Sequence, residues 1–337
     1  MIPTKQRLTE IISSLAAVRL LVVGDIVADE YLLGRPARLS REAPIPILEL
    51  TRRYFLPGGA GNAARNAADL GAKVAVVGVV GKDEAGDELC RQFVRAGIDV
   101  DGVITDPGRH TSTKTRIIGG DEQTMPQQLA RIDHIDGRLL ANGINSQIAD
   151  QAARLLAASD ALLLSDYDIA AINAEVIAAL LPLARRRNCR VVVDAHDQFG
   201  RFRGVHAATP NQPEAEAEVG HSLAGDEALQ RGAATLVERM DAEAALITRG
   251  SLGMALHERG GPTHLIPVAT YSEVRDAAGA GDTAATVYTL AVAGGATPLE
   301  AAHLANLAAG VAVCKLGVAT VTAAELRQAI AAWRPQL

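Results

Sequence analysis

Short runs of apolar residues alternate along the chain with longer stretches in which apolar positions recur at helical spacing. The runs rich in Val, Ile, Leu and Ala predict strands at Arg19–Gly24, Lys73–Val80, Ala161–Ser165, Arg190–Asp194 and Ala244–Thr248. The longer stretches predict helices at Gly61–Leu70, Glu84–Ala96, Ile144–Ala158, Ile172–Arg187 and Glu227–Met240. Strands that are apolar at every position are buried on both faces, as in a parallel sheet covered by helices. The pattern therefore predicts an α/β fold, a doubly wound and mostly parallel sheet flanked by helices.

Two stretches break this alternation and predict a second, smaller sheet. Residues Ile26–Pro57 and His110–Asp133 are strand-like in composition, but neither contains a crossover helix. We expect them to stand off the main sheet as a small β-sheet lid. The lid would be formed by insertions at about 26–57 and 109–134 of a single domain that covers residues 1–337.

The expected lid is rich in apolar side chains for an element that moves over a pocket. A small isolated sheet is marginal in water, and pairing with the same sheet of a second subunit would bury this surface with two-fold symmetry. We therefore expect a homodimer through the lid, and the alternative is that these side chains fold onto their own domain. They are Ile45, Ile47, Leu48, Leu50, Tyr54, Phe55, Ile117 and Ile118.

The composition is that of a folded globular protein, with 48% hydrophobic and 21% charged residues. The net charge of −6 argues against a nucleic-acid or anionic-membrane partner, because such partners select basic surfaces. No apolar run approaches the ~18 residues of a membrane span, and the N-terminal stretch predicts an amphipathic helix rather than a signal peptide. Cys90, Cys189 and Cys314 are far apart and lack metal-ligand spacing, so we interpret them as reduced core thiols of a cytoplasmic protein.

Near the end of the chain a glycine-rich turn, Gly279-Ala280-Gly281-Asp282, runs directly into an apolar helix. The segment fits the dinucleotide pattern G-x-G-x-x-A, but the preceding TYSEVRDAA is too polar for the buried strand that this pattern needs. A simpler interpretation is a turn in which Asp282 complements the helix dipole. A functional interpretation is an anion site made of free backbone N–H groups. Beside this site, Asp282 would accept the proton of an attacking hydroxyl.

The turn and five further motifs, in this order and spacing, resemble ribokinase-type carbohydrate kinases, the phosphofructokinase-B family. The resemblance covers nearly the whole chain. It implies a ribokinase-like fold and the ATP-dependent phosphorylation of a sugar, with Mg²⁺ as cofactor and a monovalent cation such as K⁺ as a further candidate. The motifs are PGGAGNAARNAADLG (57–71), VGKDEAGDEL (80–89), TPNQPEAE (209–216), TRGSLGM (248–254) and HLANLAAGVAVCKLGVATV (303–321).

Within this family the chain is most similar to heptose-7-phosphate kinases of lipopolysaccharide precursor synthesis. This resemblance implies that the chain phosphorylates the anomeric hydroxyl of a heptose 7-phosphate, giving a heptose 1,7-bisphosphate. The alternatives are another sugar, sugar phosphate or nucleoside as acceptor, or a catalytically impaired homologue that only binds ligands. The motifs that carry it are VVGDIVADEYLLGRPARLSREAPIPILEL (22–50), QQLARID (127–133), SDY (165–167) and RFRGVHAATPN (201–211).

The resemblance also implies roles for individual residues. Asp282 is the general base, and Gly279, Ala280 and Gly281 form the anion turn beside it. Carboxylates accept sugar hydroxyls, and a substrate that already carries a phosphate needs cationic donors. The expected acceptor-binding residues are therefore Asp25, Asp29, Gly58, Gly59, Asn62, Lys114, Arg116, Arg131 and Asp133, with Arg38 as a weaker candidate.

Each of these assignments has a structural alternative. The aspartates after the first strand can cap a turn, and the glycines can simply begin the next helix. Cations on an exposed strand can serve only to block edge pairing, and Asp133 can pair with Arg131 instead of a sugar.

The nucleotide is expected at Asn211, Glu214, Thr248, Gly250, Gly253, Asn306 and Lys315. Asn211 and Glu214 lie one helical turn apart, which is consistent with a Mg²⁺ contact of Glu214 through water. A helix that begins at Pro-Asn with an early Glu explains the same pair structurally. His196, His257 and His303 have no ligand spacing, and we interpret them as structural.

The chain departs from its relatives at three places. Ala278 stands before the turn where a threonine is usual, and Asp168-Ile169-Ala170-Ala171 follows SDY where the family has a Lys-Gly pair. Asp194-Ala195-His196 replaces the Asp-Pro-Lys of heptose kinases. Two cations near the phosphates are therefore absent from these motifs, and this loss motivates the hypothesis of an impaired homologue.

Overall fold

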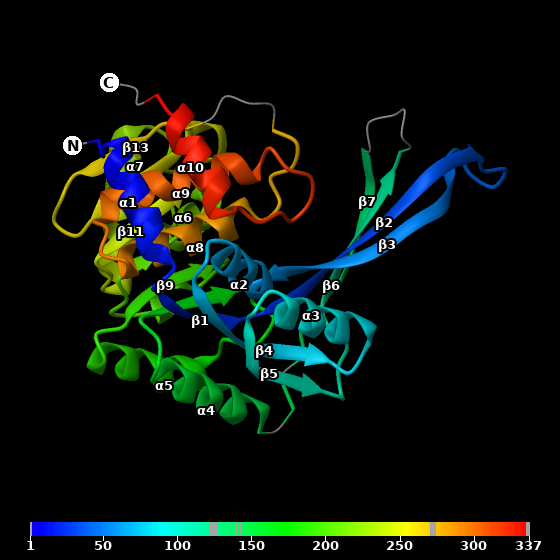
Figure 1. The fold of residues 1–337 in the computed structure, drawn as a ribbon, viewed down its shortest axis with the longest axis horizontal. Helices are drawn as coiled ribbons and strands as arrows, with labels where there is room; N and C mark the ends of the chain where they lie inside the picture. The colour runs from blue at the N-terminus through cyan, green and yellow to red at the C-terminus, as the bar shows by residue number, and fades with distance from the viewer. Residues whose placement is uncertain (1, 121–126, 139, 142, 270–273, 335–337) are drawn as a thin grey trace.

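A large twisted sheet forms the body of the molecule, and a smaller sheet extends from it (Figure 1). The computed structural model describes residues 2–120, 127–138, 140–141, 143–269 and 274–334. Within these residues the large sheet has nine strands in the order β13-β12-β11-β10-β9-β8-β1-β4-β5. They are β1 (Arg19–Gly24), β4 (Lys73–Gly81), β5 (Asp99–Asp106), β8 (Ala161–Asp166), β9 (Arg190–Ala195), β10 (Ala207–Ala208), β11 (Ala244–Thr248), β12 (Met254–Glu258) and β13 (Thr263–Ile266). All neighbouring strands from β5 to β11 are parallel, and β12 and β13 are antiparallel.

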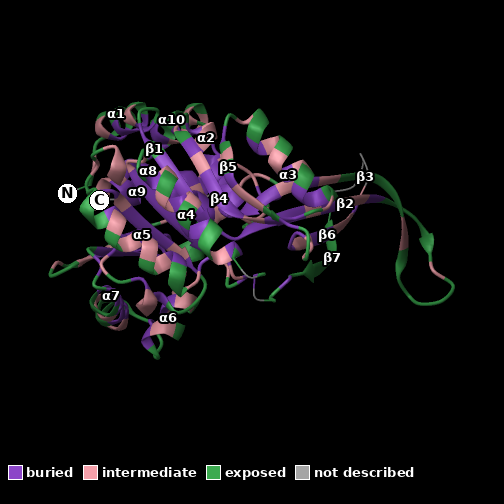
Figure 2. Ribbon diagram, turned by 90° about the horizontal axis from the view of Figure 1, so that it is seen from below, coloured by how far each residue is buried: buried purple, intermediate pink, exposed green. Residues whose placement is uncertain are grey.

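Helices cover both faces of this sheet, and each face has its own apolar core (Figure 2). One face packs against α1 (Lys5–Leu15), α2 (Ala60–Asp69), α3 (Glu84–Arg95), α8 (Ala280–Ala293), α9 (Pro298–Ala312) and α10 (Ala323–Ala332). The other packs against α4 (Ile144–Leu156), α5 (Ala174–Arg186), α6 (Gln212–Val219) and α7 (Asp226–Met240). The predicted doubly wound α/β fold is confirmed.

The smaller sheet, called the lid below, has the strand order β3-β2-β6-β7. Its strands are β2 (Ile26–Leu39), β3 (Pro46–Gly59), β6 (Thr113–Gly119) and β7 (Gln127–His134). The long antiparallel hairpin β2–β3 is buried where it leaves the body and exposed toward its tip. Strand β6 pairs with β2 in parallel, so the lid is assembled from two separate excursions of the chain.

The tip of the hairpin and strand β7 carry exposed apolar side chains, namely Leu39, Ile45, Leu50, Leu129 and Ile132. Phe55, expected on the same surface, is instead buried in the core of its own chain, because the base of β3 packs against the helices of the body. Phe55 therefore folds onto its own domain, which is the alternative given above.

The three cysteines are free, as expected, but only Cys189 is buried. Cys90 and Cys314 are partly exposed; Cys90 still packs against the apolar core, so the interpretation as a core thiol was wrong only for Cys314. None of the helices in the described part of the chain is long and apolar enough to cross a membrane.

Candidate active site

Asp282 lies in the first turn of α8, with its side chain buried between two hydrogen-bond donors. The residue is 4% exposed. The Asn62 amide at the start of α2 donates to Oδ2 at 2.6 Å, and the Tyr167 hydroxyl donates to Oδ1 at 2.6 Å. Burial raises the pKa of Asp282 to about 6, although both hydrogen bonds act in the opposite direction. A carboxylate with such a pKa accepts a proton readily at neutral pH, as a general base must.

The turn before Asp282 leaves open space at the end of the helix. Gly279 has φ +78°, and a Cβ there would lie 2.6 Å from the Asn62 amide nitrogen. Gly281 is exposed, and a Cβ built on it meets nothing within 4 Å. Because the first N–H groups of a helix have no partner within the helix, this open end of α8 suits an anion.

Six polar side chains share one face of the lid. Paired positions of neighbouring strands point to the same side of a sheet, as do alternate positions of one strand. The pairings Asp29 with Lys114 and Tyr31 with Arg116, on β2 and β6, therefore define one face. Strand β7 extends the same face, because Asp133 is paired with Lys114 and Arg131 with Arg116.

This face is turned toward the body of the molecule. The Tyr31 hydroxyl accepts a hydrogen bond of 2.9 Å from the backbone N–H of Val318, which follows α9. The Lys114 ammonium lies 4.9 Å from the centre of the Tyr167 ring. The lid thus brings its cations close to the carboxylate of Asp282, and Lys114 lowers the pKa of that group.

Asp29 and Arg116 form a buried ion pair on this face. Burial raises the pKa of Asp29, and the guanidinium of Arg116 opposes that shift. Gly58 lies opposite, where a Cβ would come 2.0 Å from the Asp29 carboxylate, so only glycine fits. Arg131 and Asp133 form an exposed pair of their own at 2.8 Å.

The carboxylate of Asp25 supports a loop. Its buried carboxylate accepts hydrogen bonds from the backbone N–H groups of Tyr167, Ile169 and Ala171 at 2.8–3.1 Å. Asp25 therefore caps a turn, which is the structural alternative given above for this residue. The loop fixes Tyr167, whose ring is also 4.2 Å from that of His196.

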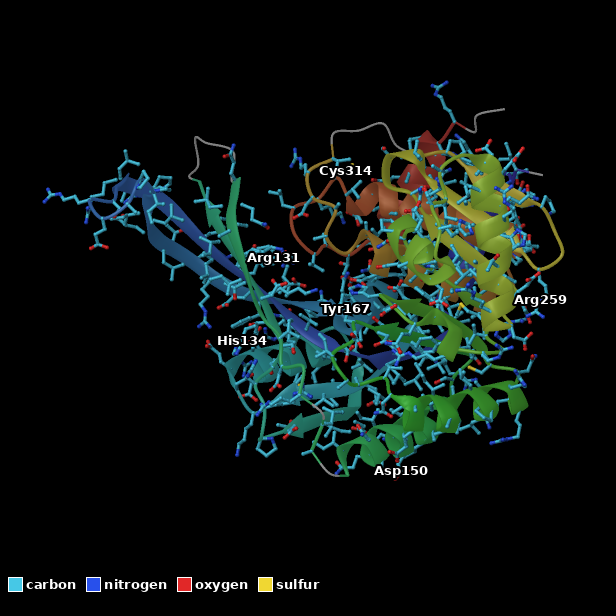
Figure 3. The ribbon with its side chains drawn as sticks, turned by 180° about the vertical axis from the view of Figure 1, so that it is seen from behind. Arg131, His134, Asp150, Tyr167, Arg259 and Cys314 are labelled. Atoms are coloured by element: carbon cyan, nitrogen blue, oxygen red, sulfur yellow. The ribbon has the colours of Figure 1, made fainter. Side chains whose placement is uncertain are left out.

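Tyr167 is the residue of this site that sequence reasoning missed. Its SDY motif was used as a family signature, and no pattern indicated that the phenol contacts Asp282. Figure 3 shows Tyr167 at the junction between the lid and the body.

Five of the seven expected nucleotide residues lie at or after the carboxyl ends of β10 and β11, namely Asn211, Glu214, Thr248, Gly250 and Gly253. Asn211 and Glu214 form a capping box at the start of α6, which is the structural role left open above. Burial raises the pKa of Glu214. The backbones of Thr248 and Asn211 are paired in an isolated parallel β-bridge. Gly253 has φ +82°, and a Cβ on it would lie 2.1 Å from the Ile266 carbonyl oxygen, so the chain requires glycine there.

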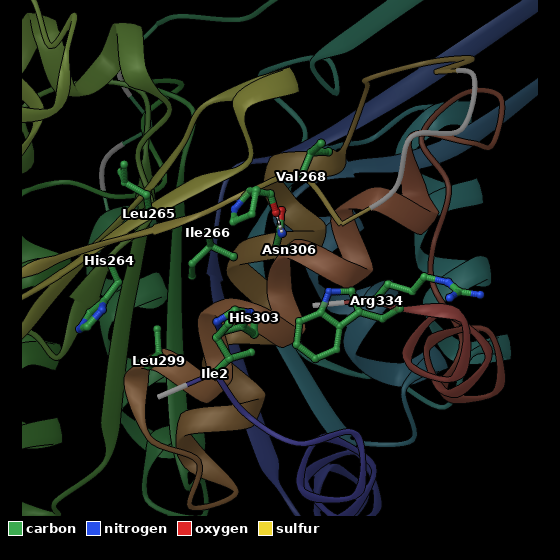
Figure 4. Close-up of a pocket in the computed structure, with 11 residues that line it drawn as sticks. Ile2, His264, Leu265, Ile266, Val268, Leu299, His303, Asn306 and Arg334 are labelled. Atoms are coloured by element: carbon green, nitrogen blue, oxygen red, sulfur yellow. Dashed lines mark hydrogen bonds between the residues drawn. The ribbon is translucent and has the colours of Figure 1, made fainter. Parts of the chain in front are cut away.

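Asn306 lines a cavity of about 210 Å³ between α9, β13 and the end of α10 (Figure 4). Its amide donates to the Pro267 carbonyl oxygen at 2.8 Å. His303 and Trp333 also line the cavity, with their ring centres 5.6 Å apart. Lys315 lies elsewhere, bonded to Glu325 and to the Thr320 carbonyl oxygen at 2.6 Å each.

Comparison with known proteins identifies the class to which this fold and site belong. The pfkB family of carbohydrate kinases matches residues 19–324. The chain belongs to this family of carbohydrate kinases. The expectation of a ribokinase-type kinase is confirmed.

Among the curated relatives are bifunctional HldE proteins. That of Geobacter sulfurreducens is 41% identical over 312 residues, which cover 92% of this chain and 62% of the relative. That of a Caulobacter species is 40% identical over 309 residues, covering 91% and 61%. The chain therefore spans about three fifths of the length of these relatives.

Solved structures show the same fold at low sequence identity. Escherichia coli phosphofructokinase-2 with substrates and products has a TM-score of 0.74 at 18% identity. Arabidopsis thaliana ribokinase with ribose and ATP has a TM-score of 0.71 at 19% identity. Each alignment covers 93% of this chain and 98% of the other.

Proposed function

We propose that the chain transfers the γ-phosphoryl group of ATP to the anomeric hydroxyl of a heptose 7-phosphate. The motifs that resemble heptose-7-phosphate kinases and the HldE relatives support this acceptor. Because the relatives are bifunctional and longer, the proposal concerns only the kinase reaction. Since ATP is abundant in the cytoplasm, a cytoplasmic location is part of the same proposal.

The observation that carries the proposal is the position of Asp282 beside an open helix end. The acceptor hydroxyl gives its proton to Asp282 while its oxygen bonds to the γ-phosphorus, and the bond to the ADP oxygen breaks. The N–H groups of the turn at Gly279–Gly281 stabilise the charge of the transferred group. Phosphoryl transfer requires mainly such positioning and charge stabilisation.

The cations of the lid face support an acceptor that already carries a phosphate. Arg116 and Arg131 are paired with Asp29 and Asp133, and among the described residues no carboxylate forms an ion pair with Lys114. The face therefore retains net positive charge in a protein of net charge −6. Arg116 and Arg131 can add a forked pair of donors to a phosphate.

ATP would extend from the open end of α8 across Thr248, Gly250 and Gly253 toward the cavity beside Asn306. The described residues contain no cluster of three metal-ligating side chains, so the chain alone does not build a closed metal site. This fits Mg²⁺, which keeps several waters and is held largely by nucleotide phosphates. Glu214, half-buried near this path, would reach the ion through water. The use of K⁺ stays a prediction of the family resemblance.

The exposed apolar residues of the lid support a homodimer formed through the lid. Leu39, Ile45 and Leu50 at the hairpin tip and Leu129 and Ile132 on β7 have no cover within the described chain. A two-fold axis between two lids would bury both sets at once.

The deciding experiment measures ADP release with Mg²⁺-ATP and a panel of acceptors. The panel contains heptose 7-phosphate, the unphosphorylated heptose, fructose 6-phosphate, ribose and a nucleoside. Turnover with heptose 7-phosphate alone is the expected result, and preference for another acceptor would reassign the substrate. No turnover with any acceptor would favour the impaired homologue, which the missing cations at Asp168–Ala171 and His196 motivate.

A further inference from the structure

Both oxygens of the Asp282 carboxylate are held by side chains that are themselves fixed. The Asn62 amide oxygen accepts a hydrogen bond of 3.0 Å from the Asn66 amide, which turns the Asn62 nitrogen toward Asp282. Asn66 is fully buried. The donor on this side of the carboxylate is therefore set by α2.

The donor on the other side, Tyr167, is fixed at three points. Its backbone N–H donates to Asp25 at 2.8 Å, which anchors the loop to the end of β1. The Lys114 ammonium lies 4.9 Å from the centre of its ring, and the centre of the His196 ring lies 4.2 Å from it. These contacts leave the hydroxyl directed at Oδ1 of Asp282, at 2.6 Å.

We propose that Tyr167 is a positioning residue for the catalytic base, which it orients and keeps ionised through the hydrogen bond from its hydroxyl. This inference rests on the proposed role of Asp282. A carboxylate oxygen accepts more than one hydrogen bond, so Oδ1 can receive the acceptor hydroxyl while Tyr167 holds it. The phenol stays protonated and so can donate, because burial and the carboxylates of Asp282 and Asp194 raise the pKa of Tyr167 well above its ordinary value.

Charged groups face Asp282 from several elements. Asp29 on β2 raises the pKa of Asp282, and Lys114 on β6 lowers it. Burial and the carboxylate of Asp282 raise the pKa of Asp194, at the end of β9, and thereby favour its neutral form. Donation from Tyr167 favours the ionised form of Asp282, and its removal has the opposite effect.

The test compares the pH dependence of kcat/KM in the wild type and in Tyr167→Phe, which removes only the hydroxyl. We expect the acid limb to move to higher pH by about one unit. The KM for ATP should not change. Tyr288→Phe is the matched control, since it removes a buried hydroxyl from the same helix as Asp282 without touching the carboxylate, and its acid limb should match that of the wild type.

A profile of Tyr167→Phe that superimposes on the wild-type profile overturns the inference. A second measurement uses the wild type and Asp282→Asn, so it does not depend on the folding of Tyr167→Phe. Protonation of Asp282 alters the hydrogen bond of the phenol, so the tyrosine ultraviolet difference spectrum should show a transition near pH 6 that Asp282→Asn lacks. Absence of this transition from the wild type also overturns it.

Asp282→Asn separates this inference from the function on which it rests. If that variant keeps wild-type turnover, the proposed base and the role of Tyr167 both fail. If it is inactive while Tyr167→Phe keeps the wild-type pH profile, only the inference fails.

Discussion

Asp29 and Arg116, 87 positions apart in the sequence, form a buried ion pair between β2 and β6 of the lid. Breaking a buried pair leaves one charge without its partner and is strongly destabilising. Arg116→Ala therefore tests the stability of the lid as much as the binding of a substrate phosphate. Lys114 is the cleaner probe of the acceptor, since among the described residues no acid is paired with it.

We predict that Lys114→Ala raises the KM for a phosphorylated sugar far more than for its unphosphorylated analogue. A charge-assisted hydrogen bond contributes about 1.5–3 kcal/mol, which corresponds to roughly 10- to 150-fold. Steady-state kinetics with both acceptors give the ratio. Lys82→Ala, which removes an exposed lysine outside the lid, should leave both KM values unchanged. Equal effects of Lys114→Ala on both acceptors would show that Lys114 does not contact the phosphate.

Asp282→Asn should lower kcat by about 10²–10⁴ and leave nucleotide affinity nearly unchanged. The amide keeps the shape of the side chain but does not accept the proton. Turnover and the Kd for ATP, measured on the same preparation, check this result. Wild-type kcat in the variant would contradict the assignment of the base.

The same variant should be more stable than the wild type at pH 7.5 but not at pH 4.5. In the folded protein the pKa of Asp282 is raised to about 6, above the ordinary value near 3.9. The protonated form is therefore favoured by folding, and its stabilising contribution is lost as pH rises through the folded pKa. Melting temperatures of Asp282→Asn and the wild type, measured at pH 7.5 and pH 4.5, test this prediction. The same difference in melting temperature at the two pH values would contradict it.

We predict that Leu50→Asp together with Leu129→Asp gives a folded monomer with weakened acceptor affinity and little change in ATP affinity. Both side chains are exposed on the lid, whereas Phe55 is buried and its replacement would test folding instead. Light scattering measures the mass, and Val94→Asp is a control at an exposed apolar residue on α3, outside the lid. A wild-type protein that is monomeric at micromolar concentration would rule out the lid dimer.

Ala170→Gly should stabilise the fold by about 1 kcal/mol. Ala170 has φ +115°, a conformation that glycine adopts without strain, and it lies in the loop capped by Asp25. Ala171→Gly is the control, because Ala171 is outside the left-handed region and gains only flexibility. In chemical denaturation, the midpoint of Ala170→Gly should be higher than that of the wild type and the midpoint of Ala171→Gly lower. A midpoint of Ala170→Gly below that of the wild type would contradict the prediction.

The central strands could be predicted from the sequence because each contains an uninterrupted apolar run. β1 and β11 begin and end at the predicted residues. The sequence missed β5, β12 and β13, which lie at or near the sheet edges and carry polar side chains, and β10, which has only two residues. A strand with one side facing water lacks the continuous apolar run that marks the central strands, and in the buried β12 this run is interrupted by His257.

The candidate site was predictable residue by residue only through the family motifs. Local patterns do not bring Asn62 to Asp282 across 220 positions, nor do they show that Asp25 bonds a loop more than 140 positions away. For Asn211 and Glu214 the sequence supported both a helix cap and a nucleotide contact, and the observed capping box does not exclude the second. Such assignments depend on tertiary contacts and on a bound ligand.

The separation of Asn62 from Asp282 also has a consequence during synthesis. At roughly 5–20 residues per second, the ribosome adds Asp282 about 10 to 45 seconds after Asn62. During that interval the alanine-rich face of α2 has been made but α8, which covers it, has not. The nascent chain must therefore keep an apolar surface from aggregating until about 220 further residues have been translated.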